Sequence, residues 1–137
     1  YFESIKQLIV KLNLEGRVLL LGYIPQEDLV CLYNMAQAAI SVSFYEGFGL
    51  PVIEAMACAK PVIASGNTSM AEIVGDCGIL VDPYNPEDVT AAMDRVLGDE
   101  NFRNSLAEKG FRRSKEFSWE KAARQMIGVW EELVGKH

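Results

Sequence analysis

One segment near the middle of the chain joins an apolar strand pattern to an apolar helix pattern through a turn that contains glycine. The strand pattern covers residues 38–43 and the helix pattern residues 51–59, and two acids, Glu46 and Glu54, bracket the turn with seven residues between them. In an open α/β sheet, the crevice that binds ligands lies outside the carboxyl ends of the strands. The segment therefore predicts an α/β fold with a ligand site at this turn.

Strand and helix patterns alternate along the 137 residues, with no linker and no internal repeat. We predict strands at residues 17–21, 38–43, 61–64 and 79–81, and helices at residues 1–14, 26–35, 51–59, 85–97, 101–117 and 118–134. Strands that alternate with helices indicate βαβ units and a parallel sheet. The predicted fold is a Rossmann-like open parallel sheet with helices on both faces, in one domain of residues 1–137.

Several side chains have expected places in this fold. Ser69 and Glu72 form the pattern of a capping box and predict a further short helix, and Ser118 is the expected N-cap of the last helix. Leu29, Leu32 and Tyr33 are expected on the inward face of their helix, and the apolar side chains of the last two helices on the flank of the sheet.

The chemistry of the turn favours an anion beside a polyol. Gly47 and Gly49 permit positive φ and a close approach of the backbone to a ligand, and Pro51 suits the first position of a helix. A helix N-terminus attracts anions, and the carboxylates of Glu46, at the end of the strand, and Glu54, in the first helical turn, can each accept two hydroxyl donors. A sugar nucleotide contains both groups. The alternative is that an acid in a first turn only complements the helix dipole.

Composition excludes several other functions. The net charge is −6 without a cluster of basic residues, which argues against nucleic acid and against a polybasic membrane surface as partners. No apolar run is long enough to span a bilayer. Cys31, Cys58 and Cys77 lack the spacing of metal ligands, the first two are expected in the core, and the set suits a reducing compartment. With a single histidine, no metal site and no histidine-based triad is expected.

Five ordered motifs carry a resemblance to one family: LGYIP at 21–25, SFYEGFGLP at 43–51, EAMA at 54–57, PVIAS at 61–65 and GILVDP at 78–83. From about Val18 onward, the chain resembles the C-terminal, donor-binding domain of the retaining glycosyltransferases of family 4, also called glycosyltransferases group 1. These enzymes have the two-domain GT-B fold. The resemblance implies a cytoplasmic hexosyltransferase of glycan biosynthesis, which moves a sugar from a UDP-, GDP- or ADP-sugar to a glycan, lipid or small-molecule acceptor without a metal cofactor.

The same resemblance implies roles for individual residues. Glu46 would lie at the transferred sugar, as the candidate catalytic residue, and Glu54 would hold the ribose hydroxyls. Further substrate contacts would come from Gly47, Phe48 and Gly49 at the sugar, Leu50 at the diphosphate, and Gly22 and Tyr23 near the base.

The chain departs from the family pattern in its basic residues. The family's Arg/Lys pair for the diphosphate has no counterpart here, because Arg17 and Lys60 each precede a predicted strand and so fall at the wrong end of the sheet. We therefore expect a fragment that lacks its first strand or strands and the N-terminal acceptor domain, binds donor weakly and is inactive alone. Through its missing part, the protein could lie at the cytoplasmic face of a membrane. The alternative function is a Rossmann-like binding or interaction module that has lost donor binding.

Overall fold

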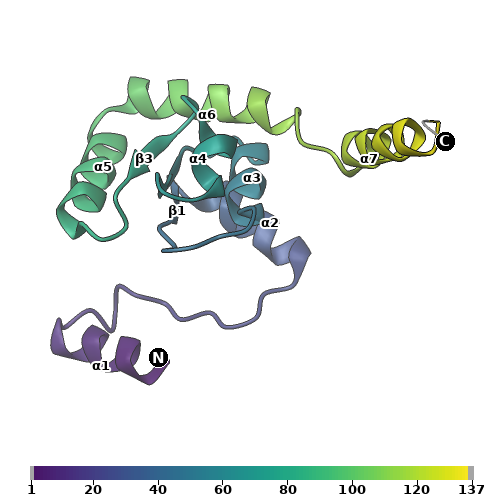
Figure 1. Ribbon diagram of the computed structural model, residues 1–137. Helices are drawn as coiled ribbons and strands as arrows, with labels where there is room; N and C mark the ends of the chain where they lie inside the picture. The colour runs from purple at the N-terminus through teal and green to yellow at the C-terminus, as the bar shows by residue number, and fades with distance from the viewer. Residues whose placement is uncertain (1, 136–137) are drawn as a thin grey trace.

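A parallel three-stranded sheet forms the centre of the molecule, in a computed structural model that describes residues 2–135. The strands are β1 (Ala39–Ser41), β2 (Val62–Ser65) and β3 (Ile79–Val81), and they lie in the order β1-β2-β3. Helices lie around this sheet (Figure 1). The predicted α/β fold with an open parallel sheet is therefore confirmed.

Alternate side chains of β2 enter two separate cores, one on each face of the sheet. On one face they meet α3 (Leu50–Ala57) and α4 (Ser69–Val74), and on the other α5 (Pro86–Gly98) and α6 (Glu100–Ser114). The first core holds Val62 and Ala64 and the second Ile63, as the two-residue period of a strand requires. Because α3 begins at the carboxyl end of β1, this packing fixes the predicted turn against the sheet.

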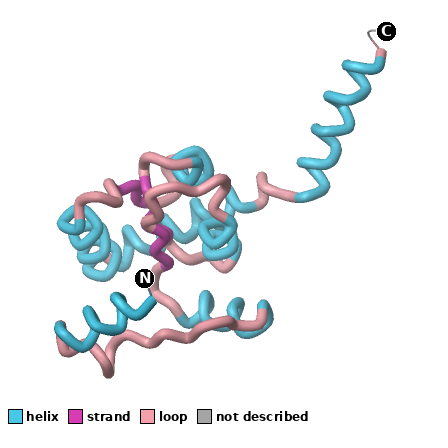
Figure 2. Tube along the Cα trace, turned by 60° about the horizontal axis from the view of Figure 1, so that its bottom comes forward, coloured by secondary structure: helices cyan, strands magenta, loops and turns pink. Residues whose placement is uncertain are grey.

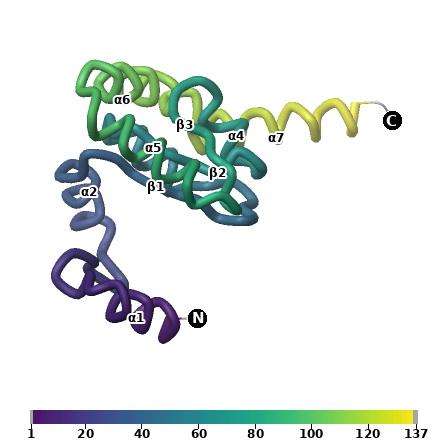
Figure 3. The backbone as a smooth tube through the Cα atoms, turned by 90° about the vertical axis from the view of Figure 1, so that its left-hand side faces the viewer, coloured from purple at the N-terminus to yellow at the C-terminus, as the bar shows by residue number. Residues whose placement is uncertain are grey.

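The predicted strand at residues 17–21 is wrong. The chain there is an extended connection between α1 (Phe2–Lys11) and α2 (Gln26–Met35) that pairs with no strand within residues 2–135. Figures 1 and 3 show α1 apart from the sheet. The apolar side chains of residues 17–21 remain exposed, with Leu19 at 74%. The segment forms no strand because a strand needs a neighbouring strand that supplies the hydrogen-bond ladder.

Helix ends follow the cap residues, with one change from the prediction. Ser118 caps α7 (Trp119–Val134) by accepting a hydrogen bond from the Lys121 amide, as predicted. The predicted capping box at Ser69 is wrong, because Thr68 caps α4 through a bond from the Met70 amide. Ser69 thereby becomes the first residue of α4, and its hydroxyl is free to bond elsewhere.

The final helix, α7, extends away from the body of the molecule (Figure 2). None of its residues is buried, and Trp119 and Trp130 are 82% and 59% exposed. The predicted packing on the sheet is therefore wrong for α7, although Phe102 and Leu106 of α6 do pack against the core. Within residues 2–135, neither α7 nor any other helix is long and apolar enough to cross a membrane.

Two further expectations concern α1 and the cysteines. The first helix is shorter than the predicted 1–14 and ends at Lys11, and residue 1 lies outside the described residues. Cys31 is exposed rather than in the core, because α2 buries none of its residues, whereas Cys58 is half-buried and Cys77 is buried. Burial raises the pKa of the Cys77 thiol, so this thiol stays protonated at neutral pH.

Candidate functional site

The turn between β1 and α3 depends on Gly49. This residue has φ 95° and ψ 50° and is buried. A Cβ atom built on it would lie 2.7 Å from Cγ of Met70 in α4. Gly47, in contrast, does not have a positive φ and has open space around it. Of the two glycines that permit a positive φ, Gly49 adopts one and Gly47 does not.

Three serine hydroxyls hold the segment that carries Glu46. Ser43 donates to Oε1 of Glu46 at 2.9 Å, and Ser69 donates to the Glu46 carbonyl at 2.8 Å. Ser65, at the end of β2, donates to the Ser43 carbonyl at 2.7 Å. Ser43 thus holds one oxygen of the half-buried Glu46 carboxylate, whereas Ser65 and Ser69 hold the backbone of the segment on either side. These roles were not predicted, although Ser43 ends one predicted strand and Ser65 directly follows another.

Glu54 lies one residue farther into its helix than expected, because α3 begins at Leu50 and not at Pro51. It is the fifth residue of α3, so it falls in the second turn rather than the first. Its half-buried carboxylate meets Tyr33 of α2, whose hydroxyl lies 3.4 Å from Oε2 of Glu54 and 3.3 Å from the carbonyl of Pro51. Burial, followed by the negative charge and hydrogen bond of Glu54, raises the pKa of Tyr33. Tyr33 therefore remains a hydrogen-bond donor at neutral pH.

The N-terminus of α3 is open, unlike those of the helices that follow it. A side chain caps α4, α5, α6 and α7, whereas α3, after Gly49, has no side-chain cap, and neither has α2 after Pro25. Uncapped amides in a first turn need another partner, and the positive end of the helix dipole suits an anion. Leu50 is the first residue of α3, so the backbone expected at a diphosphate lies at this open end.

An apolar cavity of about 350 Å³ lies beside the same turn, between α3 and the start of α7. Phe48 and Leu50 line it together with Phe117 and Trp119. Phe48 meets Phe117 edge to face, with ring centroids 6.4 Å apart. The side chain of Phe48 therefore packs toward α7, which leaves its backbone as the part of the residue available to a ligand at the turn.

Two of the predicted site residues are not brought to the turn. Gly22 and Tyr23 lie in the connection between α1 and α2, and Tyr23 is 93% exposed. Among residues 2–135, no hydrogen bond or aromatic contact joins either of them to residues 46–50. Gly22 does have a positive φ of 66°. Their proposed place near the base is therefore not supported by a contact in this structure.

Lys60 lies away from the turn, as expected from its position before a strand. Its ammonium group donates to the carbonyl of Asn34 at the end of α2, with a distance of 2.8 Å. It precedes β2, whereas the turn follows β1, and the two strands are parallel. Lys60 therefore lies at the amino ends of the strands, opposite the turn, and does not supply a cation to the start of α3.

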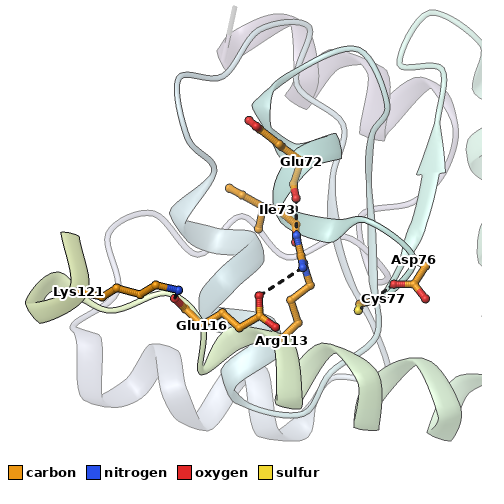
Figure 4. Close-up of polar contacts among 7 residues, drawn as sticks. All are labelled: Glu72, Ile73, Asp76, Cys77, Arg113, Glu116 and Lys121. Carbon is orange, nitrogen blue, oxygen red and sulfur yellow. Dashed lines mark hydrogen bonds and ion pairs between the residues drawn. The ribbon is translucent and has the colours of Figure 1, made fainter. Parts of the chain in front are cut away.

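Arg113 of α6 braces the helix that supports the turn (Figure 4). Its guanidinium group donates to the carbonyl of Ile73 and, at 2.6 Å, to the carbonyl of Glu72, both near the end of α4. The same helix supplies Ser69 to Glu46 and packs Met70 against Gly49. Arg113 thus connects the outer helix α6 to the residues that fix the turn.

We expect Arg113→Ala to lower the free energy of unfolding by about 1–2 kcal/mol, because two carbonyl groups lose charged donors. The control is Arg112→Ala, since Arg112 is exposed and, among residues 2–135, pairs only with Glu108 on its own helix; its expected change is below about 0.5 kcal/mol. Urea unfolding followed by circular dichroism measures both. Equal losses in the two variants would contradict the bracing role.

Comparisons with known proteins find related sequences and related structures. Residues 1–113 match the family model described as Glycosyl transferases group 1. The O-antigen chain mannosyltransferase B of Escherichia coli is 41% identical over 127 residues, which are 93% of this chain and 33% of that protein. A sucrose-phosphate synthase from Thermosynechococcus elongatus superposes with a TM-score of 0.88 at 35% identity, over 98% of this chain and 35% of that one.

A third similar protein was solved with ligands. HepE of Anabaena, in complex with UDP and glucose, superposes with a TM-score of 0.85 at 25% identity, over 96% of this chain and 36% of that one. The chain thus spans about a third of the length of the proteins it matches.

Proposed function

The chain belongs to the glycosyl transferases group 1 family, and from this premise we propose that it is the donor-binding domain of a retaining glycosyltransferase. The observation that carries the proposal is the turn between β1 and α3. It places a fixed carboxylate, Glu46, before an uncapped helix start and a second carboxylate, Glu54, behind it. A nucleotide-sugar offers sugar hydroxyls, a diphosphate and ribose hydroxyls, and each of these groups has a chemically suitable partner here.

In the proposed complex, the diphosphate lies at the open N-terminus of α3. The amide of Leu50 and the positive end of the helix dipole would stabilise the charge that builds up on the diphosphate as it leaves. Pro51 has no N–H to offer, and the Val52 amide donates to the Gly49 carbonyl. The backbone of Gly47, Phe48 and Gly49 would contact the transferred sugar. The close approach that this needs is supported by the positive φ of Gly49, which brings the chain tightly around the start of the helix.

The two carboxylates bind hydroxyl groups in this proposal. Glu46 would accept hydrogen bonds from the transferred sugar, and its negative charge would favour the positive charge that develops at the anomeric carbon in the transition state. Glu54 would accept bonds from the two ribose hydroxyls. Ser43 and Tyr33 hold one oxygen of each carboxylate, which supports a role in which direction matters.

The wider identity of the reaction is also proposed. The mannosyltransferase relative and the HepE complex with UDP and glucose support a hexose as the transferred group and a nucleoside diphosphate as the leaving group. We propose no metal cofactor, a glycan, lipid or small molecule as the acceptor, and a cytoplasmic location. Because the chain spans about a third of its relatives, we propose that a second domain of the same polypeptide supplies the acceptor site.

The test is nucleotide binding by the full-length protein, measured by saturation-transfer NMR and titration with UDP, GDP and ADP. We expect one of them to bind, and Glu54→Ala to weaken that binding by about tenfold to a hundredfold, because hydrogen bonds to a charged group are lost. The control is Glu108→Ala, because Glu108 is an exposed acid of α6 that pairs with Arg112. Absence of binding by the wild type would favour the alternative, a binding module that has lost its donor. Lys60 lies at the amino ends of the strands and bonds Asn34, away from the proposed diphosphate site, and this position favours that alternative.

A further inference from the structure

A tyrosine from a neighbouring helix touches the carboxylate that the proposed function assigns to the ribose. Tyr33 lies on α2, 21 residues before Glu54 in the sequence, and its hydroxyl lies 3.4 Å from Oε2 of Glu54. Its ring packs against the core beneath α3. The phenol is therefore held by apolar contacts on one side and presents its hydroxyl to α3 on the other.

A second acceptor places the Tyr33 hydroxyl at the N-terminal end of α3. The hydroxyl lies 3.3 Å from the carbonyl of Pro51, which is in the first turn of the helix. This end of α3 is the one that meets the turn with Glu46. The Tyr33 hydroxyl has a single hydrogen, so it donates either to the Pro51 carbonyl or to the Glu54 carboxylate at a given moment. Donation to Glu54 is therefore one of two alternative states of the Tyr33 hydroxyl.

We propose that Tyr33 is a positioning residue, which orients the Glu54 carboxylate so that it accepts the ribose hydroxyls of a nucleoside diphosphate. Donation to Oε2 restrains one oxygen of the carboxylate and leaves Oε1 without a hydrogen-bond partner among residues 2–135. A fixed acceptor binds a rigid pair of neighbouring hydroxyls with a smaller loss of side-chain entropy than a rotating one. The inference rests on the proposed function, because it requires that Glu54 binds ribose.

The competing role of Tyr33 is purely structural. A hydroxyl that only bonds the Pro51 carbonyl would hold α2 against α3 and would affect every ligand of the site equally. A positioning role is different, because it acts only on ligands that carry ribose hydroxyls. The two roles therefore predict different affinities in Tyr33→Phe. A positioning role lowers only the affinity for the ribonucleotide, whereas a structural role lowers the affinities for the ribonucleotide and for the same nucleotide without those hydroxyls alike.

The experiment measures that preference in the full-length protein by isothermal titration calorimetry. The probes are the nucleoside diphosphate that the wild type binds, out of UDP, GDP and ADP, and its 2′,3′-dideoxy counterpart. In Tyr33→Phe we expect the affinity for the ribonucleotide to fall by about fivefold to tenfold, with the affinity for the dideoxy nucleotide unchanged. Adding Tyr33→Phe to Glu54→Ala is expected to change neither affinity further. Tyr84→Phe, at a tyrosine that stacks on Phe44, controls for the loss of a hydroxyl.

Each other result counts against the inference. If Tyr33→Phe keeps the wild-type preference, or weakens both nucleotides equally, Tyr33 only supports the packing of α2. If Tyr33→Phe still acts in the Glu54→Ala background, its effect does not pass through Glu54. If the wild type binds both nucleotides equally well, the ribose role of Glu54 in the proposed function fails first. That failure is seen in the wild type and is thus distinguished from a failure of Tyr33 alone.

Discussion

Replacing Gly49 with alanine is expected to lower the free energy of unfolding by about 2–4 kcal/mol. Two costs combine at this residue. A side chain at φ 95° is strained whatever its surroundings, and the added Cβ would approach Cγ of Met70 to 2.7 Å. Met70 is completely buried, so α3 and α4 must move apart to relieve the overlap.

The same substitution should also remove nucleotide binding in the full-length protein. A shift of Gly49 displaces the first turn of α3, and with it the Leu50 amide that the proposed function places at the diphosphate. The geometry of such an anion site depends on amides that are fixed in advance. We expect no saturation-transfer signal from the nucleotide at a temperature where the variant is still folded, as checked by circular dichroism.

Gly47 provides the matched control, two residues away in the same turn. It lacks a positive φ and a Cβ there meets no atom within 4 Å. We therefore expect Gly47→Ala to change the free energy of unfolding by less than about 0.5 kcal/mol. If urea unfolding gives similar losses for the two variants, the turn is not held by the contact between Gly49 and Met70.

The fold was predictable wherever neighbouring residues decide the structure. The strands β1, β2 and β3 and the helices after them follow from apolar periodicity with Gly and Pro at the ends, and these signals are local. The extended segment at residues 17–21 has the same apolar pattern, yet it forms no strand, because no strand lies beside it within residues 2–135. The exposed apolar face of α7 shows the same limit, since a periodic pattern predicts an apolar face and does not say what covers it.

Only the site residues that lie close together in the sequence were predictable. Glu46, Gly49 and Glu54 lie within nine residues of one turn, so their order after a strand and before a helix was sufficient to find them. Two of the contacts around the acids were not found because they join residues that are far apart: Ser69 lies 23 residues from the Glu46 carbonyl that it bonds, and Tyr33 lies 21 residues from Glu54. The bond from Ser43 to the Glu46 carboxylate joins residues only three apart and was missed because a serine at the end of a strand has several possible partners. Tyr33 was correctly expected to face inward, but its hydroxyl partner depends on how α2 packs against α3.

Glu46→Gln is expected to lower kcat of the full-length enzyme by about 10²–10³-fold, the range found when a single group that stabilises transition-state charge is removed. The substitution keeps the shape of the side chain and leaves an oxygen that can still accept the bond from Ser43, which is 2.9 Å long in the wild type. It removes the negative charge and replaces one acceptor oxygen with an NH2 donor. Stability should therefore be retained, and the measurement is the initial rate of sugar transfer at varied donor concentration.

The division of the effect between kcat and KM tests what Glu46 does. A carboxylate that stabilises charge at the anomeric carbon acts mainly in the transition state, so its loss lowers kcat and kcat/KM together. A carboxylate that only holds a sugar hydroxyl binds substrate and transition state alike, so its loss raises KM and leaves kcat unchanged. Ser43→Ala keeps the charge of Glu46 but removes the hydrogen bond that orients its carboxylate. We therefore expect a smaller fall in kcat of about threefold to tenfold. A normal kcat in Glu46→Gln would show that Glu46 is a binding residue and that the catalytic group lies elsewhere.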